Sequence, residues 1–287
     1  MPRFTREQVR RRLRLALAAG ALVLLLIGGC SATLIGLLGN EDGPRQADDS
    51  AMTAPGTPSD AAALGQLPED IELAADEVMG IDVSSHQRDI DWQQVAADGY
   101  SFAYLKATEG SNFTDDRFQE NWDGAKAAGI TPGAYHYFTL CSPGADQAAD
   151  FLAAVPPDDT ALPPALDLEF DGACDERPEA DHAQSEIDAF TTAVEAAWGR
   201  RMVIYSSSEW RAHYGLPVAD TRPDWAFSEA GRPDREGWSV WQLRFDGTVS
   251  GIEGGVDIDV ARIEVLREHA AIAPDEGEMT HGSDGDG

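Results

Sequence analysis

The chain has 287 residues, enough for one large domain with appendages or for two small domains. Aspartate and glutamate total 51 against 21 lysines and arginines, and the formal charge of -30 repels phosphate backbones and anionic lipid surfaces. This charge argues against a nucleic-acid-binding protein. Three cysteines are too few for a disulfide scaffold, and their spacing predicts no zinc site, so we expect no metal and no cofactor.

The first residues combine a basic cluster with an apolar run. Six arginines and one glutamate lie in residues 1–14, whereas residues 15–38 carry no charge. This run exceeds the roughly 20 residues that a helix needs to cross a bilayer, and a preceding basic cluster stays cytoplasmic. We therefore predict a basic cytoplasmic segment, a transmembrane anchor over residues 15–38, and a folded domain outside the cell membrane. Two alternatives stay open: lipidation at Cys30, in a short match to a bacterial lipobox, or cleavage of the segment as a secretory signal.

Acidic segments flank the expected folded domain. Residues 39–78 are rich in alanine, aspartate, glycine and proline, without a sustained apolar period, and they predict a solvated, disordered linker. Residues 271–287 add acids without any lysine or arginine and predict a disordered tail. Residues 79–270 are expected to form one domain.

Within this domain, short apolar runs alternate with segments of helical periodicity. The expected strands cover residues 79–83, 101–108, 130–138, 164–170, 202–206, 225–228, 239–243 and 256–260. The expected helices cover residues 92–98, 116–128, 145–155 and 182–198. Such alternation indicates parallel strands with crossover helices. We expect an α/β fold, an irregular single β/α barrel of about eight strands with helices mainly in its first half.

Carboxylates stand where several expected strands end, which is the edge that carries the active site in β/α barrels. They are Asp82, Asp167, Glu169, Asp257 and Asp259. Side chains at positions i and i+2 of a strand face the same way, so Asp167 and Glu169 point together. Like charges held together raise the pKa of one carboxyl, which keeps it protonated for use as a general acid. Paired carboxylates at a barrel mouth indicate glycoside hydrolysis.

Six short segments also occur in a distinctive order. They are GIDVSSHQ at residues 80–87, IDW at 90–92, FAYLKATEG at 102–110, AAGI at 127–130, GAYHY at 133–137 and LDLE at 166–169. In order and spacing they resemble the N-acetylmuramidases of glycoside hydrolase family 25, and the resemblance extends to about residue 261. It implies an irregular β/α barrel that cleaves the β-1,4 bond between N-acetylmuramic acid and N-acetylglucosamine in peptidoglycan.

The resemblance also implies roles for individual residues. It assigns the catalytic acid to Glu169, a second carboxylate to Asp167, and further site aspartates to Asp82 and Asp257. The choice of Asp257 over Asp259 follows the motif. Substrate-binding rings are implied at Tyr104, Tyr135, Tyr205 and Trp225. Lys106 and His136 match family positions and are expected to be structural.

The position of Asp167 bears on the mechanism. Because it lies beside Glu169 on one strand, it is not across the sugar from the acid. We therefore expect Asp167 to orient the substrate's 2-acetamido group, which attacks the anomeric carbon with net retention. Inversion, with Asp82 or Asp257 as the base, is the alternative. Two other functions also stay open: a catalytically weak, membrane-tethered peptidoglycan-binding protein, and a chitinase-like glycosidase.

Two cysteines follow the third and fourth expected strands. Cys141 and Cys174 would therefore lie in neighbouring loops at the same end of the barrel. Such loops can bring Cα atoms within the roughly 4.4–6.8 Å that a disulfide needs, and an external location permits oxidation. We predict that the two cysteines are bonded.

Overall fold

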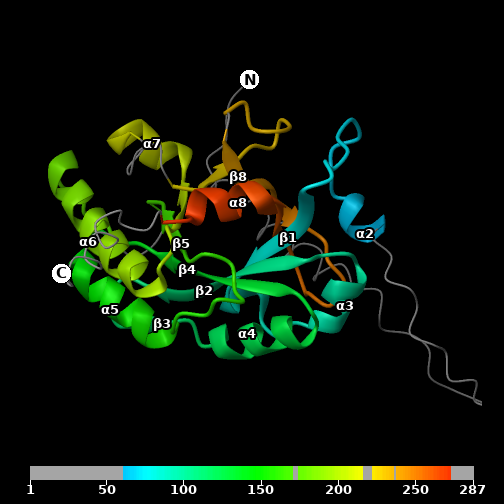
Figure 1. The fold of residues 1–287 in the computed structure, drawn as a ribbon, viewed down its shortest axis with the longest axis horizontal. Coiled ribbons are helices and arrows are strands. Elements are labelled where there is room, and N and C mark those ends of the chain that lie inside the picture. The colour runs from blue at the N-terminus through cyan, green and yellow to red at the C-terminus, as the bar shows by residue number, and fades with distance from the viewer. Residues whose placement is uncertain (1–60, 171–173, 216–221, 236, 273–287) are drawn as a thin grey trace, which may run out of the picture. The chain divides into compact units, whose positions relative to one another are not determined.

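The computed structural model describes residues 61–170, 174–215, 222–235 and 237–272. Within these residues eight strands close into a barrel, with β1 paired to both β9 and β2 (Figure 1). The barrel strands are β1 (Glu77–Val83), β2 (Phe102–Glu109), β4 (Thr131–Tyr137), β5 (Ala165–Leu168), β6 (Val203–Ser206), β7 (Asp224–Phe227), β8 (Trp238–Gly247) and β9 (Val256–Arg262). A short strand, β3 (Phe113–Thr114), forms a hairpin with β2. The expected eight-stranded barrel is confirmed.

The direction of the last strand differs from the expectation of parallel strands. Among the described strands, β9 alone runs antiparallel to its barrel neighbours, β8 and β1. Residues 248–255 between β8 and β9 are too few for a crossover helix, so the chain turns back as a hairpin. As a result, the beginning of β9 lies at the edge where the parallel strands end.

Helices flank the first half of the barrel, as the sequence predicts. They are α3 (Trp92–Ala97), α4 (Phe118–Ala127), α5 (Gly144–Ala154) and α6 (Ala180–Trp198). The side chain of Asp91 begins α3 by accepting from the backbone N–H groups of Gln93 and Gln94. The sequence analysis missed four short helices: α2 (Ala61–Leu64), η1 (Ser85–Gln87), α7 (Ser208–Tyr214) and α8 (Ile263–Ala270). Segments of eight residues or fewer contain too few turns for a clear apolar period.

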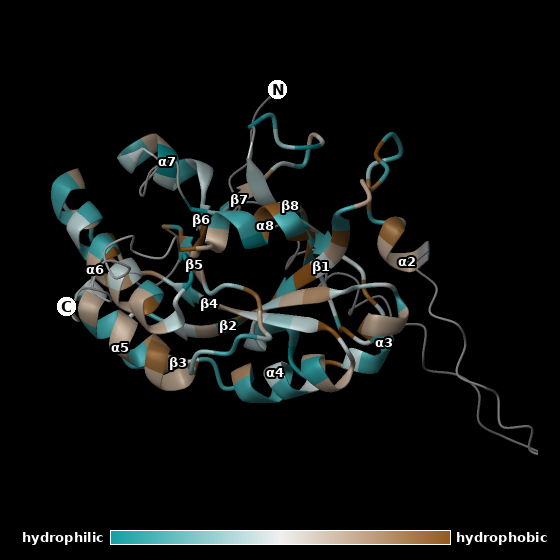
Figure 2. Ribbon diagram, viewed as in Figure 1, coloured by the Kyte–Doolittle hydropathy of each residue, from teal (hydrophilic) through white to brown (hydrophobic). Residues whose placement is uncertain are grey.

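Apolar residues pack both inside the barrel and between the barrel and its helices. Two glycines make the inner packing possible. A Cβ at Gly80 would lie 2.3 Å from the Phe102 ring, and one at Gly133 would lie 2.4 Å from the Tyr104 ring. Outside the barrel, α4 and α6 carry both hydrophilic and hydrophobic residues, as expected for helices with one face against a core (Figure 2).

The end of the predicted linker is a correction to the sequence analysis. Residues 61–76 are ordered, beginning with α2 (Ala61–Leu64), and Ala63 is 1% exposed. Leu67, Ile71 and Leu73 pack against the core, and Arg232 from the β7–β8 connection donates to the carbonyl of Glu72. This segment, residues 61–76, therefore packs against the folded domain. Its apolar residues are spaced too irregularly to reveal this packing in the sequence.

Several predicted segments lie outside the described residues. They are the basic segment 1–14, the anchor 15–38 with Cys30, the linker up to residue 60, and the tail from residue 273. Ala271, at the start of the predicted tail, still forms an antiparallel bridge with Arg200. Among the described helices, none is long and apolar enough to cross a bilayer.

Candidate active site

Carboxylates from three strands meet at the mouth of the barrel. Asp82 lies on β1, Asp167 on β5, and Glu169 is the first residue beyond β5. Because β9 runs in the opposite direction, Asp257 near its beginning pairs directly with Asp82. Asp259 pairs with Gly80, two residues earlier on β1 and therefore deeper in the barrel.

A single amide joins two of these carboxylates. The Nε2 atom of Gln242, on β8, donates to Asp82 Oδ2 at 3.0 Å and to Asp257 Oδ2 at 3.1 Å. Gln242 is only 4% exposed, so water competes weakly for these hydrogen bonds. The amide therefore fixes the positions of carboxylates from two neighbouring strands. The sequence analysis gave Gln242 no role, because the proximity depends on the closure of the barrel.

Asp259 lies beneath this pair and is fully buried. Its Oδ1 atom accepts a hydrogen bond from the indole Nε1 of Trp225 at 3.0 Å. Burial, followed by the nearby charge of Asp257, raises the pKa of Asp259 well above its usual range. Burial, followed by Asp259 and Glu169, likewise raises the pKa of Asp82. Asp259 is therefore an interior residue, whereas Asp257 is partly exposed at the mouth.

Tyr135 lies among the carboxylates. Burial and the charges of Asp82, Asp167 and Asp257, in that order, raise its phenol pKa well above 10. Its hydroxyl is therefore a neutral hydrogen-bonding group. Tyr135 is also partly exposed at the mouth. A substrate-binding role for Tyr135 stays a prediction.

The other three predicted aromatic residues belong to the packed interior. Tyr104 is fully buried, and its hydroxyl donates to the carbonyl of Pro163 at 3.1 Å. Its ring lies 4.8 Å from that of Trp225, which is 5.7 Å from Tyr205. Tyr205 and Trp225 are 5% and 4% exposed. Gly133 leaves room for the Tyr104 ring to point into the interior, and Tyr205 and Trp225 pack in the same layer. A substrate-binding role for these three rings stays a prediction.

His136 and Lys106 have structural partners. The two ring nitrogens of His136 bond to Thr108 Oγ1 at 2.7 Å and to Gln147 Oε1 at 3.0 Å. Burial lowers the pKa of His136 to about 4, so the ring is neutral near pH 7. Lys106 pairs with Glu109 at 2.5 Å and lies 4.8 Å from the centre of the Tyr137 ring.

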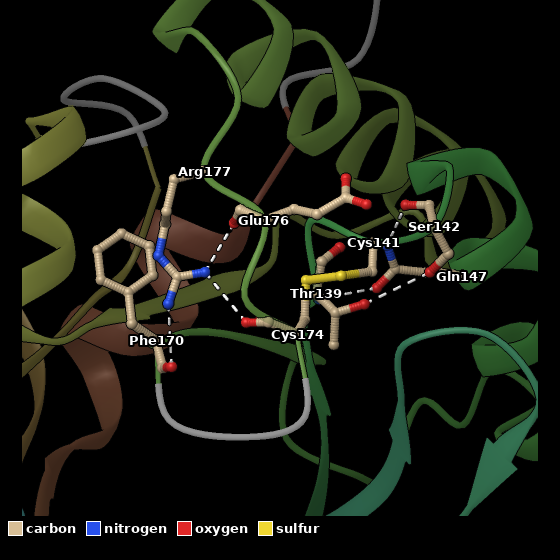
Figure 3. Close-up of a disulfide and its surroundings, with 8 residues drawn as sticks. All are labelled: Thr139, Cys141, Ser142, Gln147, Phe170, Cys174, Glu176 and Arg177. Atoms are coloured by element: carbon tan, nitrogen blue, oxygen red, sulfur yellow. Dashed lines mark hydrogen bonds between the residues drawn. A yellow bond between two sulfur atoms is a disulfide. The ribbon is translucent and has the colours of Figure 1, made fainter.

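The loop that follows Glu169 is held by a disulfide and an arginine. Cys141, between β4 and α5, is bonded to Cys174, between β5 and α6, with Cα atoms 5.8 Å apart (Figure 3). Arg177 stacks on the Phe170 ring at 4.0 Å and donates to the carbonyls of Phe170, Cys174 and Glu176. Since Phe170 directly follows Glu169, these contacts restrain the chain next to the expected catalytic acid. The predicted disulfide is present in the structure.

The arrangement defines a class of enzyme. Carboxylates gather at the C-terminal edge of a β/α barrel, and burial and mutual repulsion raise the pKa of Asp82 and of Asp259. A protonated carboxyl beside ionised ones can protonate a leaving oxygen while the others stabilise positive charge on a sugar ring. This is the chemistry of a glycoside hydrolase.

The comparisons with known proteins identify the family. The model of glycosyl hydrolases family 25 matches residues 81–252, and the chain belongs to this family of glycoside hydrolases. It is 34% identical to lysozyme M1 of Streptomyces globisporus, and the match covers 63% of this chain and 66% of that protein.

Two solved structures share the fold. A bacterial lysozyme from Streptomyces coelicolor is 32% identical, with a TM-score of 0.58 over 66% of this chain and 95% of its own. A family 25 glycosyl hydrolase from Bacillus anthracis is also 32% identical, with a TM-score of 0.60 over 67% of this chain and 91% of its own. The described barrel therefore corresponds to nearly the whole of each of these two chains.

Proposed function

We propose that this protein is an endo-N-acetylmuramidase, a lysozyme that hydrolyses the β-1,4 bond between N-acetylmuramic acid and N-acetylglucosamine in peptidoglycan. The observation that carries the proposal is the carboxylate cluster at the mouth of a family 25 barrel, with Glu169 directly beyond β5. The similarity to lysozymes gives the class of substrate.

In the proposed reaction, Glu169 donates its proton to the leaving glycosidic oxygen. Asp167, two residues earlier on β5, orients the N–H of the 2-acetamido group, whose carbonyl oxygen attacks the anomeric carbon. Glu169 then takes a proton from the water that completes hydrolysis. Proton NMR of the first-formed anomer tests this scheme: a β product supports retention, and an α product supports inversion.

The central experiment compares Glu169→Gln with the wild type on purified peptidoglycan. Loss of general acid catalysis lowers the rate by roughly 10²–10⁴. Glu176→Gln is the matched control, because Glu176 is an exposed carboxylate in the same loop. Borohydride reduction and mass analysis of the products should place the new reducing ends on muramic acid.

Other outcomes would support the alternatives. Wild-type activity in Glu169→Gln would contradict the assigned acid. Cleavage of chitin in preference to peptidoglycan would indicate a chitinase-like glycosidase, and binding without new reducing ends would indicate a peptidoglycan-binding protein.

We also propose that residues 15–38 anchor the protein in the cell membrane with the barrel outside. The six arginines before an uncharged run support this orientation, and the Cys141–Cys174 bond suits an oxidising compartment. Protease added to intact spheroplasts should release the barrel from the membrane fraction. Full-length protein in a cytosolic fraction would contradict the proposal, and labelled palmitate lost in Cys30→Ala would favour the lipoprotein.

A further inference from the structure

We propose that Gln242 is a positioning residue for the muramidase reaction. By donating to both Asp82 and Asp257, its amide holds two site carboxyls on the barrel wall that faces Glu169 across the mouth. The inference rests on the proposed function, in which Glu169 is the acid. It concerns a residue that acts through its two neighbours rather than on the substrate.

The strand order places these two carboxyls across the barrel from the acid. Three strands separate β9 from β5 on either side, namely β8, β7 and β6 on one and β1, β2 and β4 on the other. Asp257 on β9 and Asp82 on the adjacent β1 therefore lie on the wall opposite the strand that leads to Glu169. A sugar bound at the mouth then lies between the acid and the two aspartates, which can stabilise positive charge on its ring.

The backbone of β8 aims the Gln242 side chain at the mouth. Its direct neighbour across the ladder is Asp259, yet its amide bonds to Asp257, which lies two residues nearer the mouth. The pairing of β8 with β9 also changes register between Gln242 and Arg244. Such irregularities redirect side chains beside active sites. The local backbone therefore directs the amide towards the site carboxyls.

The hydrogen bonds of Gln242 differ from those of a structural glutamine in the same domain. Its Nε2 atom donates only to the two site carboxyls, whereas its buried Oε1 atom meets no donor among the described residues. In the fully buried Gln147, Oε1 bonds to the ring of His136 and to the backbone N–H of Thr139, and Nε2 donates to two backbone carbonyls. A buried acceptor without a donor is destabilising, so fold stability alone does not explain how Gln242 is oriented.

A neutral amide suits this position. A lysine or an arginine could also bind two carboxyls, but it would add positive charge beside a sugar ring on which positive charge develops. The two N–H groups of an amide hold both acids and leave the net charge of the mouth unchanged. Replacement of Gln242 should therefore slow the reaction through the two aspartates.

The first experiment detects this bridge directly in the full-length protein by NMR. Isotopic nitrogen labelling of glutamine gives one pair of side-chain N–H signals per residue, and the pair lost in Gln242→Met belongs to Gln242. We expect this pair to shift in both Asp82→Asn and Asp257→Asn, because each variant replaces an acceptor carboxyl with an amide. Asp224→Asn, at a carboxylate paired with Arg235 at 3.0 Å, should leave the pair unchanged.

A pair that responds to only one of the two aspartate variants, or to neither, would overturn the inference. If Gln242→Met does not fold, the wild type and the two aspartate variants decide alone, because one and the same pair of glutamine signals must then respond to both. This measurement does not depend on turnover. Failure of the proposed function, seen as full activity in Glu169→Gln, is therefore distinguishable from failure of the inference.

The second experiment is a double-mutant cycle on kcat/KM for peptidoglycan. Gln242→Met removes both donors while keeping the length of the side chain. We expect a loss of roughly 10–100-fold, carried by kcat, by analogy with hydrogen-bond partners that orient metal ligands. Because Gln242 acts through its neighbours, the loss should be at least about threefold smaller in the Asp82→Asn background and in the Asp257→Asn background.

Gln147→Met is the matched control for a structural role, because the hydrogen bonds of Gln147 go to other residues. It should lower Tm, and its effect on kcat/KM should be the same factor in every background. The same pattern for Gln242→Met, with an equal factor in all three backgrounds, would overturn the inference. An unchanged kcat/KM in Gln242→Met would overturn it as well.

Discussion

Removing the Cys141–Cys174 bond should destabilise the barrel by about 4 kcal/mol. The two cysteines are 33 residues apart, and the chain-entropy relation for a closed loop of that length gives about 3.7 kcal/mol at 25 °C. The perturbation is the double variant Cys141→Ser/Cys174→Ser, which leaves no unpaired thiol in either loop. For a domain of this size, the loss should lower Tm by roughly 8–15 °C.

Urea unfolding monitored by tryptophan fluorescence, with and without reductant, measures the effect. The oxidised wild type should be the more stable form, whereas the reduced wild type and the double variant should unfold together. Cys30→Ser is the matched control, because it removes a thiol without touching the bond, and its stability should equal that of the wild type. A double variant within 1 kcal/mol of the oxidised wild type would refute the reasoning.

Three further substitutions test the packing around the site. The wild type should lose about 3 kcal/mol of unfolding free energy between pH 6.5 and pH 4, because the buried His136 ring, with a pKa of about 4, stays neutral while the unfolded ring binds a proton below about 6.5. His136→Gln should abolish this loss, and urea unfolding at both pH values measures the difference. Tyr104→Phe should lower the free energy of unfolding by roughly 1 kcal/mol and leave the KM for peptidoglycan unchanged, because the lost hydroxyl donates to the Pro163 carbonyl. A raised KM would support a substrate-binding role for Tyr104. Arg232→Ala should lower the free energy of unfolding by about 3 kcal/mol in thermal unfolding, because the buried carboxylate of Glu77 loses its ion-pair partner. A near-neutral effect would contradict the packing of residues 61–76.

The sequence predicted most of the barrel because each of its elements carries a local signal. Apolar runs give the eight strands, and amphipathic periods give the four longer helices to within about two residues. The order of motifs and the alternation of Asp167 and Glu169 indicated the family and the acid. The pairing of Cys141 with Cys174 followed from their places after successive strands.

The tertiary structure decided which side chains meet. Alternation along a strand shows that Tyr104 faces inward, but the depth of its ring depends on Gly133 of a neighbouring strand. The antiparallel course of β9 brings Asp257 opposite Asp82 and places Asp259 below them. Local sequence cannot specify the contacts between β1 and β9, because they join residues more than 150 positions apart and arise only when the sheet closes. Composition and periodicity therefore determined the elements and the class of chemistry, while barrel closure determined which carboxylates meet at the mouth.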